Sequence, residues 1–180
     1  MSTPLPVALT KRLEESTALD PVVRAVRPFG DMFVANPAVR DLLRGAWLGH
    51  ALHPVMTDAP IGFWVSATVL DLVGGPDARP SAQRLVGLGL LLAAPTAWTG
   101  WAEWSGSGQR EQRVGVVHVA AVGASVALYS ASWVARRRDR HGPGVALGLA
   151  ATTALGVAGY LGGHLVAARK VGSRHPAHAE

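Results

Sequence analysis

Residues 114–135 read VGVVHVAAVGASVALYSASWVA, and residues 144–168 read GVALGLAATTALGVAGYLGGHLVAA. Neither stretch contains an Asp, Glu, Lys or Arg residue. A buried helix of a soluble domain is usually shorter, whereas roughly 20 apolar residues cross the hydrocarbon core of a bilayer. The two stretches therefore predict two membrane-spanning helices.

Two further apolar segments precede these stretches. Pro60 lies near the entrance of the first and marks either the start of its helix or a kink. Only 16% of the 180 residues are charged and 49% are hydrophobic, whereas soluble domains carry roughly 25% charged residues. The sequence therefore predicts an all-α fold with a four-helix transmembrane bundle in residues 46–168. Its helices are expected at about 54–75, 84–104, 114–135 and 144–168.

The segments that flank the bundle are more polar. Residues 1–45 predict a short helical segment that is soluble or lies at the membrane interface. Residues 169–180 predict a flexible basic tail, in which His175 and His178 lie near one another without being organised around a metal. The short N-terminal helices are expected at about 21–27 and 37–44, where Asp20-Pro21 and Asn36-Pro37 each supply a capping side chain and a first-turn proline.

The net charge of +5 comes mainly from arginines between the apolar runs rather than on one amphipathic face. This pattern indicates membrane flanks and argues against a nucleic-acid partner. The basic residues are nearly balanced between the two ends of the predicted helices. A small excess on the side of both termini predicts a multi-pass protein of the cell membrane with its termini in the cytoplasm. The chain contains no cysteine, so a metal bound within it must use His, Asp or Glu.

Four successive spans place the start of the first and third helices and the end of the second and fourth on one membrane face, called side A here. Two histidines at matching depth near this face, His118 and His164, are candidate ligands of a b-type haem. Other imidazole and carboxylate groups of side A are candidate ligands of a metal ion. These candidate metal ligands are His50, His53, Asp58 and Glu103.

Helical spacing predicts which polar side chains face the bundle interior. His118, Ser125, Tyr129 and Ser132 share one face of the third helix. Asp71 lies near the other end of the first helix, at about the level of Tyr129 and Ser132, and their hydroxyl groups are its expected partners. The counterpart on the fourth helix is the line Thr153, Val157, Tyr160 and His164.

Three motifs together resemble one family. They read LGHALHPVMTDAPIGFW (48–64), RVGVVH (113–118) and GYLGGHLV (159–166). In their order and spacing the chain resembles the DUF2231 family of bacterial integral membrane proteins from about Leu43 to Val166, although Ala51 stands where the family usually has a proline. The resemblance implies a four-helix membrane domain of uncharacterised role, whose relatives are sometimes joined to Rieske-type iron–sulfur domains. Without cysteines, this chain would need a Rieske-type or other redox protein as a separate partner.

Three functions remain open. The polar groups can hydrogen-bond across helices in a structural or accessory subunit that associates with redox proteins. Alternatively, His118 and His164 bind haem b or, together with the candidate metal ligands of side A, hold a metal ion in an electron-transfer protein of the membrane. A third alternative is proton or solute transport along His118, Ser125, Tyr129 and Asp71. No Gly-x-Ser-x-Gly or His-Glu-x-x-His motif favours an enzyme.

Overall fold

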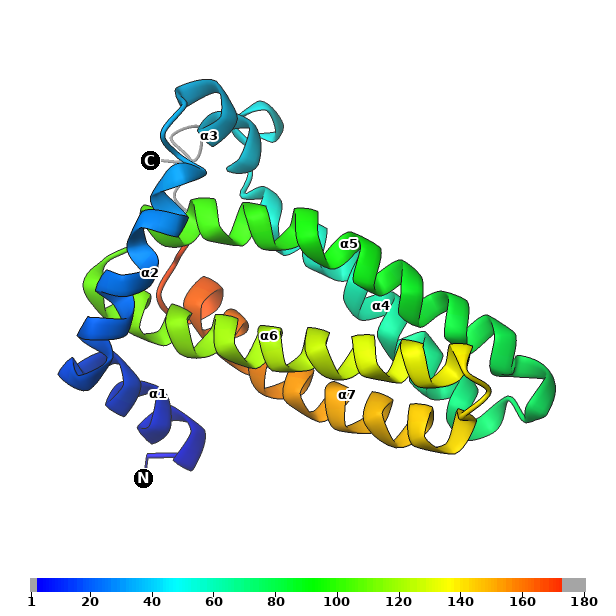
Figure 1. Ribbon diagram of the computed structural model, residues 1–180. Coiled ribbons are helices and arrows are strands. Elements are labelled where there is room, and N and C mark those ends of the chain that lie inside the picture. Colours follow the sequence, from blue (N-terminus) through cyan, green and yellow to red (C-terminus); the bar gives the residue numbers. More distant parts are fainter. Residues whose placement is uncertain (1–2, 173–180) are drawn as a thin grey trace. The chain divides into compact units, whose positions relative to one another are not determined.

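The computed structural model describes residues 3–172, which contain helices and no strand (Figure 1). The α-helices are α1 (Leu5–Glu15), α2 (Asp20–Met32), α3 (Pro37–Leu43), α4 (Leu52–Val73), α5 (Arg79–Ser105), α6 (Gln109–Arg137) and α7 (His141–Gly163). Shorter turns are η1 (Thr17–Leu19), η2 (Ala46–Leu48), η3 (Pro76–Ala78) and the π-helical turn η4 (His164–Ala168). This confirms the predicted all-α class.

The chain divides into two compact units, and helices α4–α7 contribute residues to both. Unit 1 consists of Met1–His53, Ala97–Ala120 and Gly159–Glu180. Unit 2 consists of Pro54–Thr96 and Ala121–Ala158. Each unit has its own buried apolar cluster.

Three helical segments in the described residues are long and apolar enough to cross a membrane. The fourth predicted span corresponds to α4, which does not reach the same hydropathy. Asp58 and Asp71 lower its hydropathy, and Pro60 lies inside the helix and is buried. α4 begins at Leu52, so of the two alternatives predicted for Pro60 the helix start is wrong. The three qualifying segments are Pro76–Ser105, Gln109–Arg137 and His141–Ala168.

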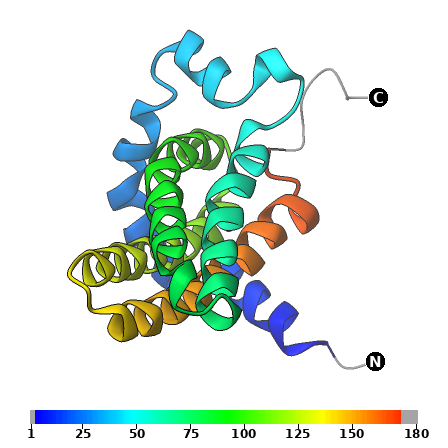
Figure 2. The same cartoon turned by 90° about the vertical axis from the view of Figure 1, so that its right-hand side faces the viewer.

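The core of unit 2 is built around two stacked aromatic rings. Trp64 on α4 and Tyr129 on α6 lie with their ring centroids 4.4 Å apart. The Trp64 indole donates a hydrogen bond to the Val86 carbonyl on α5 (3.3 Å), and the Tyr129 hydroxyl lies 2.8 Å from that of Thr152 on α7. Segments of α4, α5, α6 and α7 thus meet around one pair of rings, and Figure 2 shows them from one end. The small buried residues of this cluster, Ala67, Ala82 and Ala151, let the helices approach closely.

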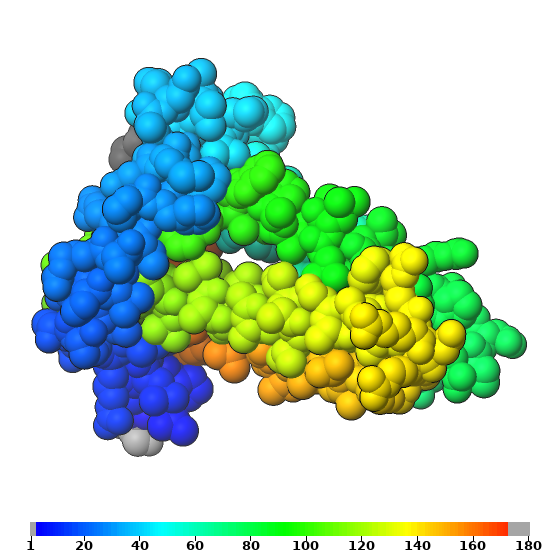
Figure 3. Space-filling view, in the orientation of Figure 1, coloured from blue at the N-terminus to red at the C-terminus, as the bar shows by residue number. Residues whose placement is uncertain are grey.

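The core of unit 1 joins the N-terminal segment to the ends of the long helices. Val23 on α2 packs with Trp104 of α5 and Val116 of α6. The ring of Phe29, also on α2, lies edge-on to Trp101 with 5.1 Å between centroids. Figure 3 shows α2 lying over the first turns of α6. The segment before residue 45 is therefore folded onto the helices that follow it.

The N-terminal helices differ from their prediction in extent. α2 is longer than expected, and α1 was not predicted at all. Asn36 caps α3 as predicted, because its side chain accepts hydrogen bonds from the backbone N–H groups of Ala38 and Val39 at 2.9 and 3.3 Å. Asp20 instead begins α2 without capping it, since its carboxylate is engaged by an arginine described below. The histidines predicted at 175 and 178 lie outside the described residues.

Gly89 on α5 gives a test of the packing in unit 2. A Cβ atom at this position would overlap the Trp64 indole, so Gly89→Ala is expected to destabilise the protein by about 1–3 kcal/mol. Gly123→Ala on α6 is the control, because nothing lies within 4 Å of its Cβ position and alanine favours helix by up to about 1 kcal/mol. Thermal unfolding in detergent should show a lower midpoint for Gly89→Ala alone. Equal midpoints would contradict the close approach of α5 to Trp64.

Candidate functional site

Glu14 on α1 is buried beside basic side chains from the C-terminal part of unit 1. The His164 Nε2 lies 2.7 Å from the Glu14 Oε1, and the Arg169 Nε lies 3.3 Å from the same oxygen. The Arg169 Nε is also 3.0 Å from Glu111 Oε1 on α6, although among the described residues it is aligned with no acceptor for a hydrogen bond. A His164 ring that is protonated at Nε2 donates to this carboxylate, because an ionised carboxylate only accepts hydrogen bonds. The π-helical turn η4 places His164 in this cluster.

Arg113 on α6 holds the same N-terminal segment at a second point. Its Nε and Nη2 donate to the two carboxylate oxygens of Asp20 at 2.7 and 2.9 Å, and its Nη1 donates to the Glu14 carbonyl at 2.9 Å. Hydrogen bonding with Arg113, together with its charge, lowers the pKa of Asp20 below the ordinary value of 3.8, against the opposing effect of burial. This planar, two-bond arrangement fixes direction as well as distance.

The two candidate haem ligands have different surroundings. His164 uses Nε2 to contact Glu14, so ligating an iron through that nitrogen would require the contact to break. The His118 ring lies against α7, since a Cβ atom at Gly162 would be 3.1 Å from its Cε1 atom. The glycine at 162 is therefore what leaves room for the imidazole between α6 and α7.

The four candidate metal ligands are not gathered by the structure. His53 lies with its Nδ1 3.1 Å from the Thr99 hydroxyl and its ring against Gly100. His50 and Asp58 are exposed, and Glu103 lies at the wall of the cavity described below. Within residues 3–172, no group of three or more His, Asp or Glu side chains is arranged to hold a metal ion.

The strongest polar contact of unit 2 is a buried ion pair between α4 and α6. Both guanidinium Nη atoms of Arg136 donate to the carboxylate of Asp71, at 2.8 and 2.5 Å, and only 2% and 5% of the two side chains are exposed. The prediction of hydroxyl partners for Asp71 is therefore wrong. Ser132 enters the same network indirectly, because it accepts a hydrogen bond from Arg136 Nε and donates one to the Gly144 carbonyl.

The face of α6 that was predicted to point inward is buried where it enters unit 2. Ser125, Tyr129 and Ser132 are at most 1% exposed, and Ser125 donates to the Ala151 carbonyl at 3.0 Å. Arg136 follows Ser132 at the next helical repeat of four, so it continues this face. The missed partner of Asp71 could thus have been found by extending the spacing one step.

The predicted polar line Thr153, Val157, Tyr160 and His164 is wrong for its first three residues, whereas His164 is largely buried beside Glu14. Thr153, Val157 and Tyr160 are exposed, while the neighbouring Thr152 faces the interior. Its hydroxyl lies 3.1 Å from that of Thr68 and 2.8 Å from that of Tyr129. A shift of one residue rotates a helical face by about 100° because there are roughly 3.6 residues per turn.

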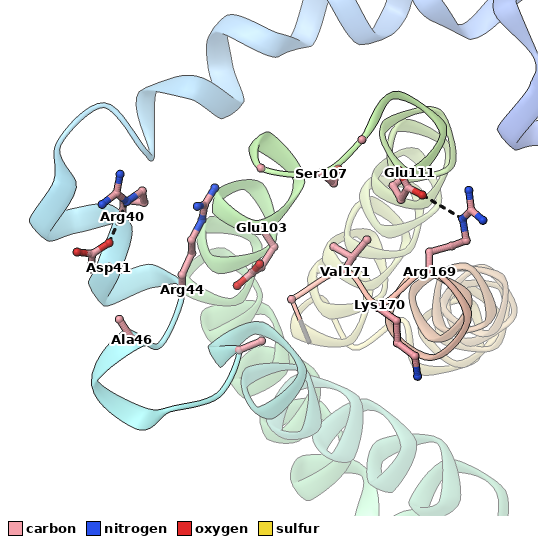
Figure 4. Close-up of a pocket in the computed structure, with 14 residues that line it drawn as sticks. Arg40, Asp41, Arg44, Ala46, Glu103, Ser107, Glu111, Arg169, Lys170 and Val171 are labelled. Atoms are coloured by element: carbon pink, nitrogen blue, oxygen red, sulfur yellow. Dashed lines mark hydrogen bonds and ion pairs between the residues drawn. The ribbon is translucent and has the colours of Figure 1, made fainter. Parts of the chain in front are cut away.

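A cavity of about 750 Å³ opens in unit 1 (Figure 4). Arg44 forms part of its wall and donates from Nε and Nη2 to the Ala102 carbonyl, at 3.1 and 2.9 Å. The charged residues that line the cavity are Arg40, Asp41, Arg44, Glu103, Glu111, Arg169 and Lys170. Sequence reasoning named only Glu103 among them, because these residues come from four separate stretches of chain.

The comparisons with known proteins agree with this architecture. Residues 49–175 match a family model described as "Predicted membrane protein (DUF2231)". The chain belongs to the DUF2231 family. The DUF2231 match begins after α3, so Glu14, Asp20 and Arg44 lie outside it. No curated protein and no solved structure matches the chain significantly.

The ion pair of Asp71 and Arg136 should dominate the stability of unit 2. Asp71→Asn removes one charge and leaves the other buried, so it is expected to cost about 3–5 kcal/mol. Asp31→Asn is the matched control, since the Asp31–Arg27 pair is half-exposed and its loss should cost less than about 1 kcal/mol. Chemical unfolding in detergent measures both variants. A cost for Asp71→Asn as small as that of the control would contradict the role of the pair.

The contact between Asp20 and Arg113 predicts how docking of the N-terminal segment depends on pH. Because the pKa of Asp20 is lowered in the folded state, the contact stabilises docking above the unfolded pKa of about 3.8, and this stabilisation is lost as pH falls through the lower folded value. Hydrogen exchange, corrected for intrinsic rates, should show α2 losing protection below about pH 4. Asp20→Asn should lose part of this protection already at pH 6 and change less on acidification. Identical pH profiles for both proteins would refute the assignment.

Proposed function

We propose that this DUF2231 protein is a multi-pass membrane protein with a structural or accessory role, in which α4 is a fourth span. The family description and the three long apolar helices support insertion in a bilayer. α4 has 22 residues, which at about 1.5 Å per residue extend roughly 33 Å, enough to cross the hydrocarbon core of about 30 Å.

Two polar residues of α4, Asp71 and Thr68, have partners on neighbouring helices. Asp71 pairs with Arg136 on α6, and the Thr68 hydroxyl lies 3.1 Å from that of Thr152 on α7. The apolar side chains that remain exposed on α4 suit contact with lipid tails. These side chains are Val55, Val65, Val69, Leu72 and Val73.

The buried pair of Asp71 and Arg136 is the observation that carries the structural role. The intramembrane polar residues predicted as functional are used in contacts between helices: Asp71 with Arg136, Ser125 with Ala151 and Tyr129 with Thr152. Such contacts join helices in lipid. An accessory role beside a separate redox protein, as the family resemblance implies, stays a prediction.

The haem and transport alternatives each need one of these contacts to break. Haem ligation through the His164 Nε2 displaces Glu14, and a proton path ending at Asp71 must compete with Arg136. Optical spectra of protein purified from cells supplied with haem and metals test the first alternative. A haem absorption that disappears in both His118→Ala and His164→Ala would overturn the structural role.

The absence of cysteine makes the number of spans directly measurable. Single cysteines replacing Ala38, Asp77, Arg110 and Arg138 can be labelled from one side of the membrane with an impermeant maleimide. If α4 is a span, Ala38→Cys and Arg110→Cys react from one face, and Asp77→Cys and Arg138→Cys react from the other. Labelling of Ala38→Cys together with Asp77→Cys would show three spans and refute the proposal. The same data give the orientation, for which the arginine balance predicts Ala38 in the cytoplasm.

A further inference from the structure

The cavity of unit 1 lies where three candidate membrane spans begin or end. Glu103 is close to the end of the span Pro76–Ser105, Glu111 is near the start of Gln109–Arg137, and Arg169 follows the last residue of His141–Ala168. In a protein that spans the bilayer as proposed above, these positions lie at the level of the lipid head groups. The cavity volume of about 750 Å³ lies within the range of small-molecule sites.

The cavity wall contains two ion pairs, and within each pair the arginine and the carboxylate neutralise each other. Arg40 Nε lies 2.9 Å from the Asp41 Oδ1, and Arg169 Nε lies 3.0 Å from the Glu111 Oε1. These pairs leave Arg44, Lys170 and Glu103 as the charged groups of the wall that no ion pair engages in the described part of the chain. Figure 4 shows the Lys170 side chain pointing away from Arg44 and Glu103, so the cavity presents one cation and one anion to a ligand.

Arg44 is positioned to receive an oxyanion. Its contact with the Ala102 carbonyl uses two of the five guanidinium N–H groups and holds the side chain against the end of α5. Figure 4 shows Arg44 and Glu103 next to each other at the cavity wall. A ligand that carries a phosphate and an ammonium group complements this arrangement, with the phosphate at Arg44 and the ammonium at Glu103.

Exposed apolar residues lie next to cavity-lining residues in the chain. Ala46 lines the cavity, and the two residues that follow it, Trp47 and Leu48, are exposed, as is Leu42 on α3. Trp47 is 66% exposed and Leu42 57% exposed, which is unfavourable in water for such side chains. Tryptophan is enriched at the interface between head groups and hydrocarbon. This surface suits the acyl chains or glycerol region of a lipid whose head group occupies the cavity.

We propose that the cavity binds a phosphoethanolamine group, presented by the head group of phosphatidylethanolamine. The inference rests on the proposed membrane placement. Arg44 holds the phosphate, Glu103 accepts hydrogen bonds from the primary ammonium, and Leu42 and Trp47 contact the lipid beneath the head group. Binding is non-covalent and needs no co-reactant.

Native mass spectrometry of the full chain in detergent tests this proposal with three lipids of identical acyl chains. Phosphatidylethanolamine is expected to bind about tenfold more tightly than phosphatidylcholine, because a quaternary ammonium has no N–H to donate to Glu103. Phosphatidylglycerol, which has the phosphate without the ammonium, should also bind more weakly. Soluble O-phosphoethanolamine is added as a competitor to separate recognition of the free group from recognition of the lipid.

Two variants assign the contacts. Glu103→Gln should reduce the preference for phosphatidylethanolamine over phosphatidylcholine to about twofold or less, and Arg44→Gln should weaken binding of both lipids. Arg138→Gln is the matched control, because it removes the same charge from an exposed residue that does not line the cavity. The control should keep the tenfold preference. Should Arg44→Gln fail to fold, Arg44→Lys replaces it, because lysine keeps the charge but lacks the planar guanidinium that binds a phosphate through two N–H groups.

Each outcome bears on the proposal. Equal binding of the three lipids by the unaltered protein, stronger binding of phosphatidylglycerol, or an unchanged preference in Glu103→Gln would overturn it. Displacement of the lipid by micromolar O-phosphoethanolamine would make the soluble group the ligand instead. The cysteine labelling does not depend on lipid type, so four spans without a lipid preference would remove only this inference, whereas failure to insert in membranes would remove both.

Discussion

A carboxylate and a guanidinium that are both out of contact with solvent join α4 to α6 in unit 2. Burying the charge of Asp71 alone among apolar side chains would cost free energy, and so would burying that of Arg136 alone. Their two parallel hydrogen bonds compensate part of that cost only in one relative position of the helices. The Nε of Arg136 also donates a hydrogen bond to the Ser132 hydroxyl, which donates one to the Gly144 carbonyl on α7. One pair of charges thus fixes three helices, and the stacked rings of Trp64 and Tyr129 fill the space beside it.

Unit 1 depends on a comparable constraint of a different kind. Glu14 and Asp20 come from helices that precede the part of the chain matched by the DUF2231 model. They engage His164 and Arg113, which belong to the matched part. Each of these basic groups is largely buried and would lose a charged or polar partner if the N-terminal segment were absent. The segment is therefore part of the fold rather than a tail.

The sequence predicts the long helices well and the contacts between them less well. Uncharged runs of about 20 residues have few stable alternatives to a spanning helix, so α6 and α7 were found within a few residues of their ends. The buried face of α6 was also predictable, because Ser125, Tyr129 and Ser132 repeat at helical spacing. The buried face of α7 was not, since a helix rich in Ala and Gly has little polar contrast and Thr152 and Thr153 compete for the inward position.

Other features were missed because their determinants are far apart in the chain. α1 has mixed polarity, and its buried residues include Thr10 and Glu14, so apolar periodicity gives little indication of it. Tyr129 and Ser132 lie at about the depth of Asp71, so their hydroxyl groups were reasonable candidates for its partners. Arg136 was missed because an arginine at the end of a helix was interpreted as a membrane flank. The cavity likewise takes its charges from four separate stretches of chain. Local spacing can predict a face of one helix, whereas a site assembled from several stretches requires their arrangement in space.

The two groups of charges differ in what they can do. The pair of Asp71 and Arg136 is almost fully buried, and all of its carboxylate oxygens are used, so an exchanging ligand would have to break it. The cavity of unit 1 is open to solvent and holds charges that the described residues leave without an ion-pair partner. Its wall includes Arg44, which hydrogen bonds to a backbone carbonyl already hold in place. This side chain therefore loses less conformational entropy when a ligand binds. Reversible recognition is therefore expected in unit 1, while the buried charges of unit 2 maintain the fold.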